Sequence, residues 1–577
     1  MYRTLTCGEL DESFIGKQVT VAGWVSVVRD HGGIVFIDLR DRYGFVQLTT
    51  QDDSYLESLS RESVISVTGT VVKRSEDTIN PKIKSGKVEV QIEKLVVLSE
   101  AKKNLPFEVE ESTKTNEELR LKYRYLDLRN PEMQKRLKLR SDVLFEIRSI
   151  MHGMGFDEYQ TPILTASSPE GARDYLVPSR VHKGKFYALP QAPQQFKQLL
   201  MCAGMDKYFQ IAPCFRDEDL RADRSPEFYQ LDIEMSFVEQ EDIFAVCEDL
   251  LYRLFSKFGK YEVEDKHFVR IPYREAMIKY GSDKPDLRNP IVMHDLSQVF
   301  KNTTFGAFKD KTIEGFALNT NGQSKSFYEK LTKLMLDMGA GGLAWVRVEE
   351  DGSLKGPIVK FITNEECEAL KEETGAKIGD DIFVIADSNA KLCYKLAGTL
   401  RTEVGQKVGL IKENVYKFCW IVDFPMYEID EETNELTFCH NPFSMPQGGI
   451  DALEHQNPLD IVAYQYDIVL NGVELSSGAV RNADVKTMLK AFEIVGRGEE
   501  EVKEKFGALY QAFQYGAPPH AGIAPGVDRM IMMMLDEPNI REIMAFPMNS
   551  KAQDLMMNAP CEVSEAQLRD VHVKIRQ

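Results

Sequence analysis

The stretch from Phe209 to Phe237, FQIAPCFRDEDLRADRSPEFYQLDIEMSF, constrains the fold more than any other stretch of the sequence. Apolar and polar residues alternate on both sides of a long charged loop, which predicts two β-strands connected by that loop. In the first strand Phe209, Ile211 and Phe215 are expected on the buried side. In the second strand one face is expected to form core and the other a polar surface, and the expected core residues are Tyr229, Leu231, Ile233, Met235 and Phe237.

The polar face of this strand pair combines a cation, carboxylates and an aromatic ring. The alternation places Arg216 on the same face as Asp232 and Glu234, together with Phe228. The connecting loop adds two further arginines, and planar guanidinium groups match the oxygens of phosphate. The face therefore predicts a phosphate-binding site, although scattered charges on the wet face of an ordinary sheet would produce the same alternation.

The segments FRDEDLRADR and PEFYQLDIE resemble motif 2 of class II aminoacyl-tRNA synthetases, in the form typical of the bacterial-type aspartyl enzymes of subclass b. The resemblance implies that Arg216 holds the α-phosphate of ATP and the amino acid carboxylate, and that Phe228 stacks on adenine. It also implies ATP contacts for Asp217, Glu218 and Ser225. Ser225 departs from the family pattern, because many relatives carry a longer amide side chain there.

The composition describes an ordinary multidomain protein of 577 residues, with 43% hydrophobic and 28% charged residues. No apolar run is long enough to span a membrane, and the first residues lack the apolar core of a signal peptide. The nine cysteines form no CxxC pair, so a reducing, cytoplasmic location is expected. The net charge of -19 argues against a broad basic surface, so a nucleic-acid partner is expected to meet local basic patches.

Residues 18–99 contain five short apolar-alternating segments separated by turn signals. Five strands with little helix at an N-terminus predict a small barrel of the OB-fold type. The alternation turns Phe36 outward, and it also turns Gln47 outward because Val46 and Leu48 take the inward positions. An exposed ring beside polar groups is typical of single-stranded RNA binding, but a ring in this position could equally cover a barrel edge.

This N-terminal segment is similar to the anticodon-binding domain of the same synthetases. The resemblance implies that Arg29, Phe36 and Gln47 contact the tRNA anticodon. His31 lies in the same loop, and a histidine there is typical of relatives that charge both tRNA-Asp and tRNA-Asn.

The rest of the chain divides into a hinge and a catalytic core with an insertion. After Pro131 an amphipathic helix is predicted up to Gly155, followed by a strand that contains Pro162. This order resembles motif 1, which implies a homodimer. The expected domains are the OB-fold at 1–103, a hinge at 104–130, an N-terminal half of the catalytic core at 131–285, a bacterial-type insertion at 286–417, and a C-terminal half of the core with an extension at 418–577.

Several residues outside motif 2 are candidates for amino acid binding. Gln194 and Lys197 lie one helical turn apart in QAPQQFK, where a lysine on a helix surface would be the commonplace alternative. His440 lies beside a proline turn, where most histidines are structural. By the resemblance, Glu170 belongs to a loop that closes over the amino acid, and the residues that bind aspartate are Glu170, Gln194, Lys197, Arg216, Asp232, His440 and Arg481. Ala192 replaces a serine of many relatives.

The dipeptide Asn471-Gly472 is a strong signal for a two-residue β-hairpin turn. That turn places Asp467 and Glu474 on one face, and two carboxylates near a phosphate site suit Mg²⁺, although solvent-facing acids are the simple alternative. Arg481 would lie on the opposite face of a regular strand, so a break at Ser477-Gly478 is expected to redirect it. The resemblance implies that both acids hold magnesium, that Glu474 also contacts ATP, and that Arg481 pairs with the aspartate side chain.

The C-terminal segment GIAPGVDRMIMMML predicts a glycine-rich turn that leads into an apolar helix. Arg529 lies in the first helical turn, against the helix dipole, so a bound anion would explain it. The segment resembles motif 3, which implies that Arg529 holds the γ-phosphate and that Gly526, Val527 and Asp528 contact ATP. Pro525 departs mildly from the family pattern.

The predicted fold class is α+β: an OB-fold β-barrel, a class II antiparallel-sheet core with flanking helices, and an α+β insertion. The resemblance covers nearly the whole chain and implies an aspartate–tRNA ligase, with Arg216 and Arg529 as catalytic residues. Expected partners are ATP, Mg²⁺, L-aspartate and tRNA-Asp, with tRNA-Asn as an open possibility, and no membrane. An asparaginyl or lysyl enzyme of the same subclass, or a non-catalytic RNA-binding relative, are the alternatives.

Overall fold

The computed structural model describes residues 1–167, 172–430 and 433–576. The chain divides into two compact units: Met1–Lys138 with Met544–Cys561, and Leu139–Ile543 with Glu562–Gln577. Within the described residues no helix has the length and apolar character needed to cross a bilayer. Glu170 lies outside the described residues.

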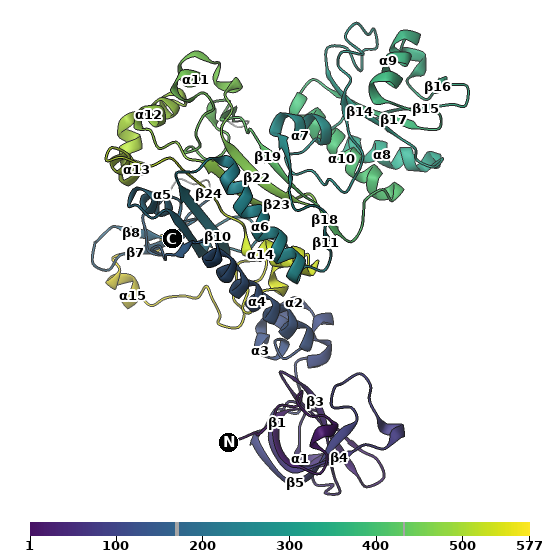
Figure 1. Ribbon diagram of the computed structural model, residues 1–577, viewed down its shortest axis with the longest axis vertical. Helices are drawn as coiled ribbons and strands as arrows, with labels where there is room; N and C mark the ends of the chain where they lie inside the picture. Colours follow the sequence, from purple (N-terminus) through teal and green to yellow (C-terminus); the bar gives the residue numbers. More distant parts are fainter. Residues whose placement is uncertain (168–171, 431–432, 577) are drawn as a thin grey trace. The chain divides into compact units, whose positions relative to one another are not determined.

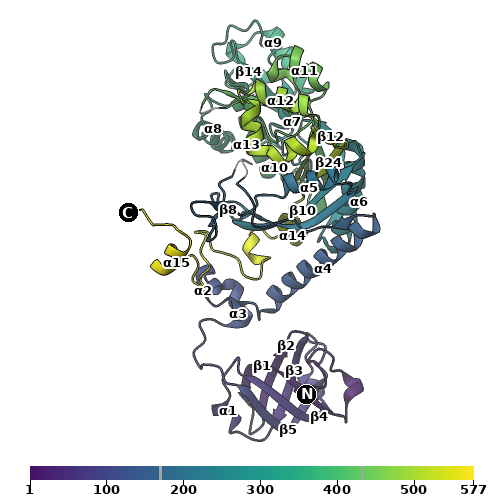
Figure 2. The same cartoon turned by 90° about the vertical axis from the view of Figure 1, so that its left-hand side faces the viewer.

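The first unit contains a closed five-stranded barrel with strand order β1-β2-β3-β5-β4, as the OB-fold prediction requires (Figures 1 and 2). Alternate residues of β4 point into a core of valine, isoleucine and leucine. Gly69 lets two strands approach closely, because a Cβ atom there would lie 2.1 Å from the carbonyl oxygen of Gln91. The strands are β1 (Gln18–Asp30), β2 (Val35–Asp41), β3 (Gly44–Thr50), β4 (Val64–Lys73) and β5 (Val88–Ser99).

Short helices occupy much of the segment expected to be a hinge, namely α2 (Glu117–Lys122) and α3 (Arg124–Asp127). Buried Asp127 accepts hydrogen bonds from Arg120 at 3.0 Å and from Arg124 at 2.5 Å. Arg124 also donates to the backbone oxygen of Met544 at 2.7 Å. The hinge and the other domain boundaries stay predictions, but this segment is folded around a buried ion-pair cluster.

An eight-stranded, mostly antiparallel sheet forms the centre of the second unit, in the order β12-β19-β22-β23-β24-β10-β9-β6 (Figure 1). Only the edge pairs β12/β19 and β6/β9 run parallel within the described sheet. Helices α6 (Gln240–Phe258) and α14 (Val527–Leu535) pack against it. The strands are β12 (Val269–Pro272), β19 (Phe418–Val422), β22 (Gln465–Leu470), β23 (Val473–Val480), β24 (His520–Ile523), β10 (Glu227–Ser236), β9 (Lys207–Phe215) and β6 (Asp157–Glu158).

Strands β9 and β10 pair as the sequence predicts, with Asp232 opposite Gln210, but the predicted burial is wrong in three respects. Phe237, which was expected in the core, is 71% exposed directly after the end of β10. In β9 Phe209 is buried, whereas Ile211 and Phe215 are only half-buried. In β10 the face that carries Asp232 and Glu234 is buried rather than a polar surface. Helix α5 (Gln194–Cys202) covers that face, and such a long-range contact leaves no trace in the alternation.

The amphipathic helix after Pro131 is α4 (Pro131–Gly153), so it ends two residues earlier than Gly155. The strand expected next is only the two-residue β6, since Pro162 lies beyond it without strand structure. Helices α11 (Gly449–His455), α12 (Val485–Ile494) and α13 (Glu499–Phe513) pack one against the next, and α13 contacts α5. Helix α15 (Glu565–Asp570) lies near the C-terminus. Short strands complete the unit: β7 (Leu176–Pro178), β8 (Phe186–Ala188), β11 (Glu262–Val263), β18 (Val415–Tyr416), β20 (Tyr427–Ile429) and β21 (Leu436–Phe438).

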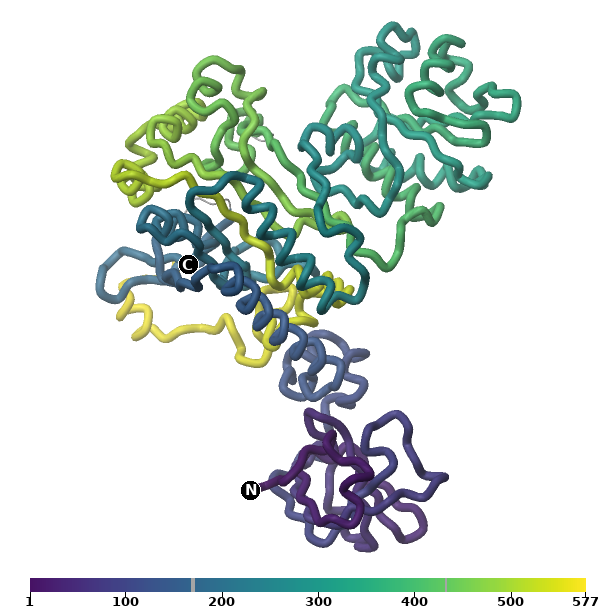
Figure 3. The backbone as a smooth tube through the Cα atoms, in the orientation of Figure 1, coloured from purple at the N-terminus to yellow at the C-terminus, as the bar shows by residue number. Residues whose placement is uncertain are grey.

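The chain between β12 and β19 forms a separate five-stranded sheet with its own hydrophobic cores, traced in teal and green in Figure 3. Its order is β13-β14-β17-β15-β16. This α+β arrangement agrees with the predicted fold class of the insertion. The elements are α7 (Tyr273–Tyr280), β13 (His294–Asp295), β14 (Thr312–Leu318), α8 (Lys325–Asp337), β15 (Ala344–Val348), β16 (Leu354–Lys355), α9 (Asn364–Thr374), β17 (Asp381–Asp387) and α10 (Ala390–Val408).

Candidate active site

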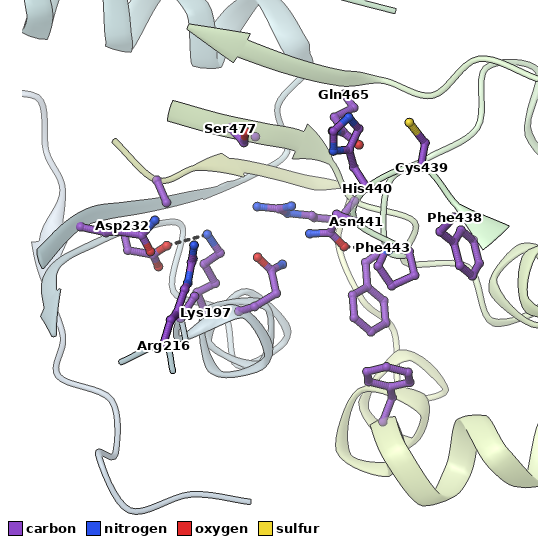
Figure 4. A pocket seen from close by; sticks show the side chains of 18 of the residues that line it. Lys197, Arg216, Asp232, Phe438, Cys439, His440, Asn441, Phe443, Gln465 and Ser477 are labelled. Carbon is purple, nitrogen blue, oxygen red and sulfur yellow. Dashed lines mark hydrogen bonds and ion pairs between the residues drawn. The ribbon is translucent and has the colours of Figure 1, made fainter. Parts of the chain in front are cut away.

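A cavity of about 610 Å³ opens over the central sheet of the second unit. Figure 4 shows Lys197, Arg216 and Asp232 on one side of it, and His440, Asn441 and Phe443 on the other. The lining residues that matter below come from α5, β9, β10, β22, β23 and the loop around residue 440, and they are Gln194, Lys197, Arg216, Gln230, Asp232, His440, Asn441, Gln465, Ser477 and Arg481.

Two cations and two carboxylates form a buried cluster at the base of this cavity. The Nζ atom of Lys197 lies 2.7 Å from Asp232 and 3.4 Å from Glu234. Arg481 forms a two-pronged pair with Glu234, at 2.9 and 3.0 Å. Each of the four residues is at most 4% exposed. Charges this deeply buried are costly unless they are paired, so the cluster requires all of its members.

The two carboxyl groups of the cluster differ in how easily they ionise. Burial raises the pKa of Asp232, and the opposing effect of Lys197 does not cancel this. Burial would also raise the pKa of Glu234, but Arg481 and Lys197 outweigh it and lower that pKa. One oxygen of Asp232 lacks a hydrogen-bond partner among the described residues. This oxygen is a hydrogen-bond acceptor, so the cluster can take up one further donor at Asp232.

Arg216 lies at the end of β9, on the same side of the sheet as Asp232. Its guanidinium carbon is 5.0 Å from the centre of the Phe228 ring, which is a cation–π distance. Arg216 forms no ion pair with any described residue, so its donors point into the cavity without a competing carboxylate.

Arg529 approaches the site from the N-terminal turn of α14. It donates to the backbone oxygen of Glu474 at 2.6 Å and lies 3.6 Å from Asp223. Backbone pairing joins this turn to β10, because Leu231 donates to the carbonyl oxygen of Pro525 at 2.8 Å. The predicted motif 2 and motif 3 segments are therefore neighbours, although about 300 residues separate Arg216 from Arg529 in the sequence.

The predicted hairpin β22/β23 turns at Asn471-Gly472, and both residues have the positive φ of 50° and 84° that this turn needs. The pairing skips one residue, because Ile468 pairs with Ser476 while Val469 pairs with Glu474. The irregularity thus lies at Leu475, and the expected break at Ser477-Gly478 is wrong. The extra residue at Leu475 turns the side chains that follow it to the opposite face of the strand, which is the predicted effect. Arg481 therefore lies on the same face of the sheet as Glu474.

Asp467 and Glu474 lie close together at this hairpin. Burial, and then the nearby Glu474 charge, raise the pKa of Asp467 well above its usual range. One oxygen of Asp467 is buried and lacks a partner among the described residues. Glu474 accepts from Ser477 at 3.3 Å and contacts Lys284 at 3.1 Å. An acid pair of this kind favours a bound cation, which would offset the second charge.

Other predicted nucleotide residues have partners within the protein. Buried Asp528 contacts Arg140 at 2.5 Å and accepts from the backbone nitrogen of Tyr229 at 2.7 Å, so its carboxylate fixes α14 against β10. Val527 is core, and the nitrogen of Gly526 donates to the backbone oxygen of Leu475. The other predicted ATP-binding residues lie in the loop after β9. Asp217 is 4.0 Å from Arg173, and Glu218 is 3.2 Å from Arg224. Ser225 is half-buried.

The predicted RNA-contacting residues cluster on the outer face of the barrel. Arg29 pairs with Asp38 at 2.6 Å, and the rings of His31 and Phe36 lie 5.8 Å apart, edge to face. Gln47 is only 6% exposed, so its predicted outward exposure is wrong. Its amide donates to Glu89 on β5 at 2.9 Å, and this neighbouring strand covers it.

Sequence reasoning missed several residues at the pocket. Gln465 and Asn441 line it, and each is adjacent in strand or loop to a residue that was predicted, which is the only signal they offer. Behind the cluster, His520 contacts Gln198 at 3.2 Å, and burial lowers the pKa of His520. Lys284 follows α7 in GSDKPDLR, and nothing in its local sequence indicates that it reaches Glu474.

Comparison with known proteins yields consistent matches. Residues 116–550 match the family model "tRNA synthetases class II (D, K and N)", and residues 19–98 match "OB-fold nucleic acid binding domain". The aspartate–tRNA ligase of Streptomyces coelicolor is 54% identical over 582 residues, covering 100% of this chain and 99% of that protein. The aspartate–tRNA(Asp/Asn) ligase of Rickettsia prowazekii is 52% identical over 590 residues, covering 100% and 97%.

The asparaginyl-tRNA synthetase of Pyrococcus horikoshii, solved with asparaginyl-adenylate, shares the fold at a TM-score of 0.58. It is 18% identical, with 95% of this chain and 98% of that chain covered.

Proposed function

The chain belongs to the class II tRNA synthetases for aspartate, lysine and asparagine, and from this premise we propose that it is an aspartate–tRNA ligase that uses ATP to attach L-aspartate to tRNA-Asp. The observation that supports this best is the buried cluster of Lys197 and Arg481 with Asp232 and Glu234. It offers two cations to one additional carboxylate, the group that distinguishes aspartate from asparagine.

Specificity follows from the burial of these cations. The side-chain carboxylate of aspartate would accept hydrogen bonds from Lys197 and Arg481, while Gln194 and His440 line the same cavity. An uncharged amide would lack the negative charge that these two buried cations attract, so it would be bound less tightly than a carboxylate. For a polar site of this kind, discrimination of about 10⁴-fold or more is within reach.

Amino acid activation requires no nucleophilic side chain from the protein. The α-carboxylate of aspartate attacks the α-phosphorus of ATP, a new P–O bond forms, and pyrophosphate leaves from the opposite side. Arg216, which is free of competing carboxylates among the described residues, would stabilise the charge on the α-phosphate, with Phe228 against adenine. Arg529 would bind the γ-phosphate. In the second step a 3′-terminal ribose hydroxyl of tRNA attacks the aspartyl carbonyl, and AMP leaves.

A magnesium ion fits the acid pair at the hairpin. Asp467 offers a buried oxygen without a partner among the described residues, and Glu474 lies beside it. Mg²⁺ is usually coordinated by one or two protein carboxylates when phosphates supply further ligands. Among the described residues there is no group of three or more side chains that could bind a metal ion. When bound, the ion would neutralise charge on the phosphates. Asp467 and Glu474 would hold it, and Arg529 would keep Glu474 in place.

The barrel is proposed to bind the tRNA anticodon through Arg29, His31, Phe36 and Gln47. Gln47 is buried beside Glu89. It would therefore either contact RNA through the part of its amide that remains exposed or hold Glu89 in position. Relatives named aspartate–tRNA ligase and relatives named aspartate–tRNA(Asp/Asn) ligase match this chain about equally well, so tRNA-Asn is a candidate second substrate.

A homodimer and a cytoplasmic location complete the proposal. Phe145 on α4 is 73% exposed, and Ile163 and Leu164 in the following segment are also exposed, which is unusual for large apolar side chains unless a partner covers them. All nine cysteines are free, as in a reducing compartment. Light scattering should give twice the chain mass of 65.7 kDa, and a fully active monomer would contradict the dimer.

The decisive experiment is ATP–pyrophosphate exchange with a panel of amino acids, followed by charging of tRNA-Asp and tRNA-Asn transcripts. Exchange with aspartate alone supports the proposal. Exchange with asparagine or lysine would indicate another enzyme of the subclass, and no exchange with any amino acid would favour a non-catalytic relative. Charging of the tRNA-Asn transcript would define a non-discriminating enzyme.

A further inference from the structure

Lys284 is a cation at the acid pair that the mechanism above does not use. It follows α7 in a turn that begins at Gly281, and its backbone nitrogen donates to the Ser282 side chain at 3.0 Å. Its Nζ atom lies 3.0 Å from Asp283 and 3.1 Å from Glu474. The side chain of Lys284 is 39% exposed.

Glu474 is the point at which two cations from distant segments meet. Lys284 contacts its carboxylate, and Arg529 donates to its backbone oxygen at 2.6 Å. Arg529 is the residue assigned above to the γ-phosphate. A second cation therefore contacts the same residue as Arg529, and unlike the buried Lys197 and Arg481 its side chain is partly exposed.

The turn that carries Lys284 is fixed by the inserted domain. A Cβ atom at Gly281 would lie 2.3 Å from the carbonyl oxygen of Tyr394 and 2.5 Å from the Cα atom of Gly398, so α10 packs directly against the turn. Buried Arg401, also on α10, donates to the backbone oxygens of Asp286 at 3.1 Å and Asn289 at 2.8 Å. Helix α10 thus holds the segment on both sides of Lys284.

We propose that Lys284 is a further ATP-binding residue, which contacts the phosphates of ATP beside Glu474 and which helix α10 of the inserted domain positions. The proposal rests on the proposed function, because the nucleotide site is defined by Arg216 and Arg529. A lysine on its flexible stem can exchange one anionic partner for another, and the triphosphate of ATP carries more negative charge than the Asp283 and Glu474 carboxylates that Lys284 now contacts. The inserted domain then has a role at the catalytic site.

Calorimetric titration of the full-length chain with Mg²⁺ and α,β-methylene-ATP, which the enzyme cannot cleave at the α-phosphate, tests this. Lys284→Gln should weaken binding of the analogue about 10- to 100-fold, the usual loss of a hydrogen bond to a charged group. Lys284→Arg should retain most of the affinity. The matched control is Lys279→Gln, which removes a lysine paired with Glu275 on the exposed face of α7 and should bind the analogue like the unaltered chain.

Two further measurements separate this role from a structural one. The affinity for aspartate should be unchanged in Lys284→Gln, and Gly398→Ala, which presses on the Gly281 turn, should weaken analogue binding less than Lys284→Gln does. Unchanged analogue binding in Lys284→Gln, or an equal loss of analogue and aspartate binding, would overturn the proposal. Absence of aspartate-dependent exchange in the unaltered chain, with the Lys284 effect retained, would instead overturn the proposed function and leave the nucleotide contact supported.

Discussion

The cavity and the N-terminal barrel carry similar side chains on their sheets, but they differ in exposure. In the cavity, Lys197 and Arg481 face Asp232 and Glu234, and each is at most 4% exposed. On the barrel, Arg29 faces Asp38 with side chains 44% and 26% exposed. Both regions thus combine guanidinium, carboxylate, amide and aromatic groups, and solvent access is what separates them.

This difference predicts two kinds of recognition. Buried charges are screened little by salt, and an unpaired one is expensive, so the cavity should discriminate strongly and tolerate few substitutions. Exposed pairs contribute little to stability and exchange partners easily, so the barrel should bind through many small contributions. The following substitutions test this contrast, from the largest expected effect to the smallest.

Arg481→Leu should have the largest effect, because it leaves Glu234 buried with only Lys197, at 3.4 Å, as a cationic partner. We expect aspartate-dependent pyrophosphate exchange to fall about 10²- to 10⁴-fold, and the free energy of unfolding to fall by about 3–5 kcal/mol. Exchange assays and urea unfolding measure the two effects.

Arg253→Leu is the matched control for that variant. Arg253 lies 3.4 Å from Asp249 in an exposed pair on α6, and its loss should cost under about 1 kcal/mol of stability and leave exchange unchanged. If Arg481→Leu proved equally mild, the buried cluster would not be the aspartate site.

Glu314 in the inserted domain sharpens the comparison, because it is a buried carboxyl that pairs with no cation among the described residues. Neither of its oxygens has a hydrogen-bond partner among the described residues. Burial, and then the Asp295 charge, raise its pKa to about 9. The folded state therefore keeps a proton that the unfolded state releases, so stability should fall as the pH rises from the ordinary glutamate range towards 9, by at most about 1.4 kcal/mol per pH unit.

Glu314→Gln should flatten this pH dependence, since glutamine has the same shape and never ionises. Melting temperatures at pH 5.5, 7 and 8.5 measure it, with the variant more stable than the unaltered chain at the highest pH. Glu329→Gln on α8, an exposed residue 3.4 Å from Lys325, is the control and should follow the unaltered chain. Parallel curves for Glu314→Gln and the unaltered chain would mean that Glu314 ionises normally.

Phe36→Ala tests the barrel. Stacking of one base on an aromatic ring contributes about 1–3 kcal/mol, so KM for tRNA should rise about 10- to 100-fold while amino acid activation is unchanged. Tyr43→Ala removes an exposed ring just beyond the other end of β2 and should leave KM for tRNA unaltered. An equal effect of both variants would mean that the ring of Phe36 only stabilises the barrel.

The sequence predicted local features well, because their causes are local. The turn at Asn471-Gly472 needs two residues that accept positive φ, and the spacing of Gln194 and Lys197 needs one helix. The OB-fold followed from alternation in five short segments. In each case a single stretch of chain contains the whole physical reason.

Several failures involve contacts that one strand sequence does not contain. Alternation shows that Gln47 and Asp232 point away from the apolar side of their strands, but not that β5 or α5 covers them. The irregularity at Leu475 depends on pairing with β22, and Lys284 contacts Glu474 from a turn that packs against α10. Burial of a polar face is a property of the packed structure, so an isolated strand sequence cannot reveal it.

Arg29→Ala should have the smallest effect, and it completes the contrast with Arg481. Because the Arg29–Asp38 pair is exposed, its loss should change stability by under about 1 kcal/mol. Without Arg29 the Asp38 carboxylate would repel the RNA phosphates, so KM for tRNA should rise several-fold. Raising the salt concentration should weaken tRNA binding in the unaltered chain and less steeply in the variant, whereas the KM for aspartate should respond to salt in neither, because bulk ions do not reach the buried cluster. A KM for aspartate that changes with salt, together with a KM for tRNA that does not, would contradict the contrast. The cavity would then behave like an exposed site and the barrel like a buried one.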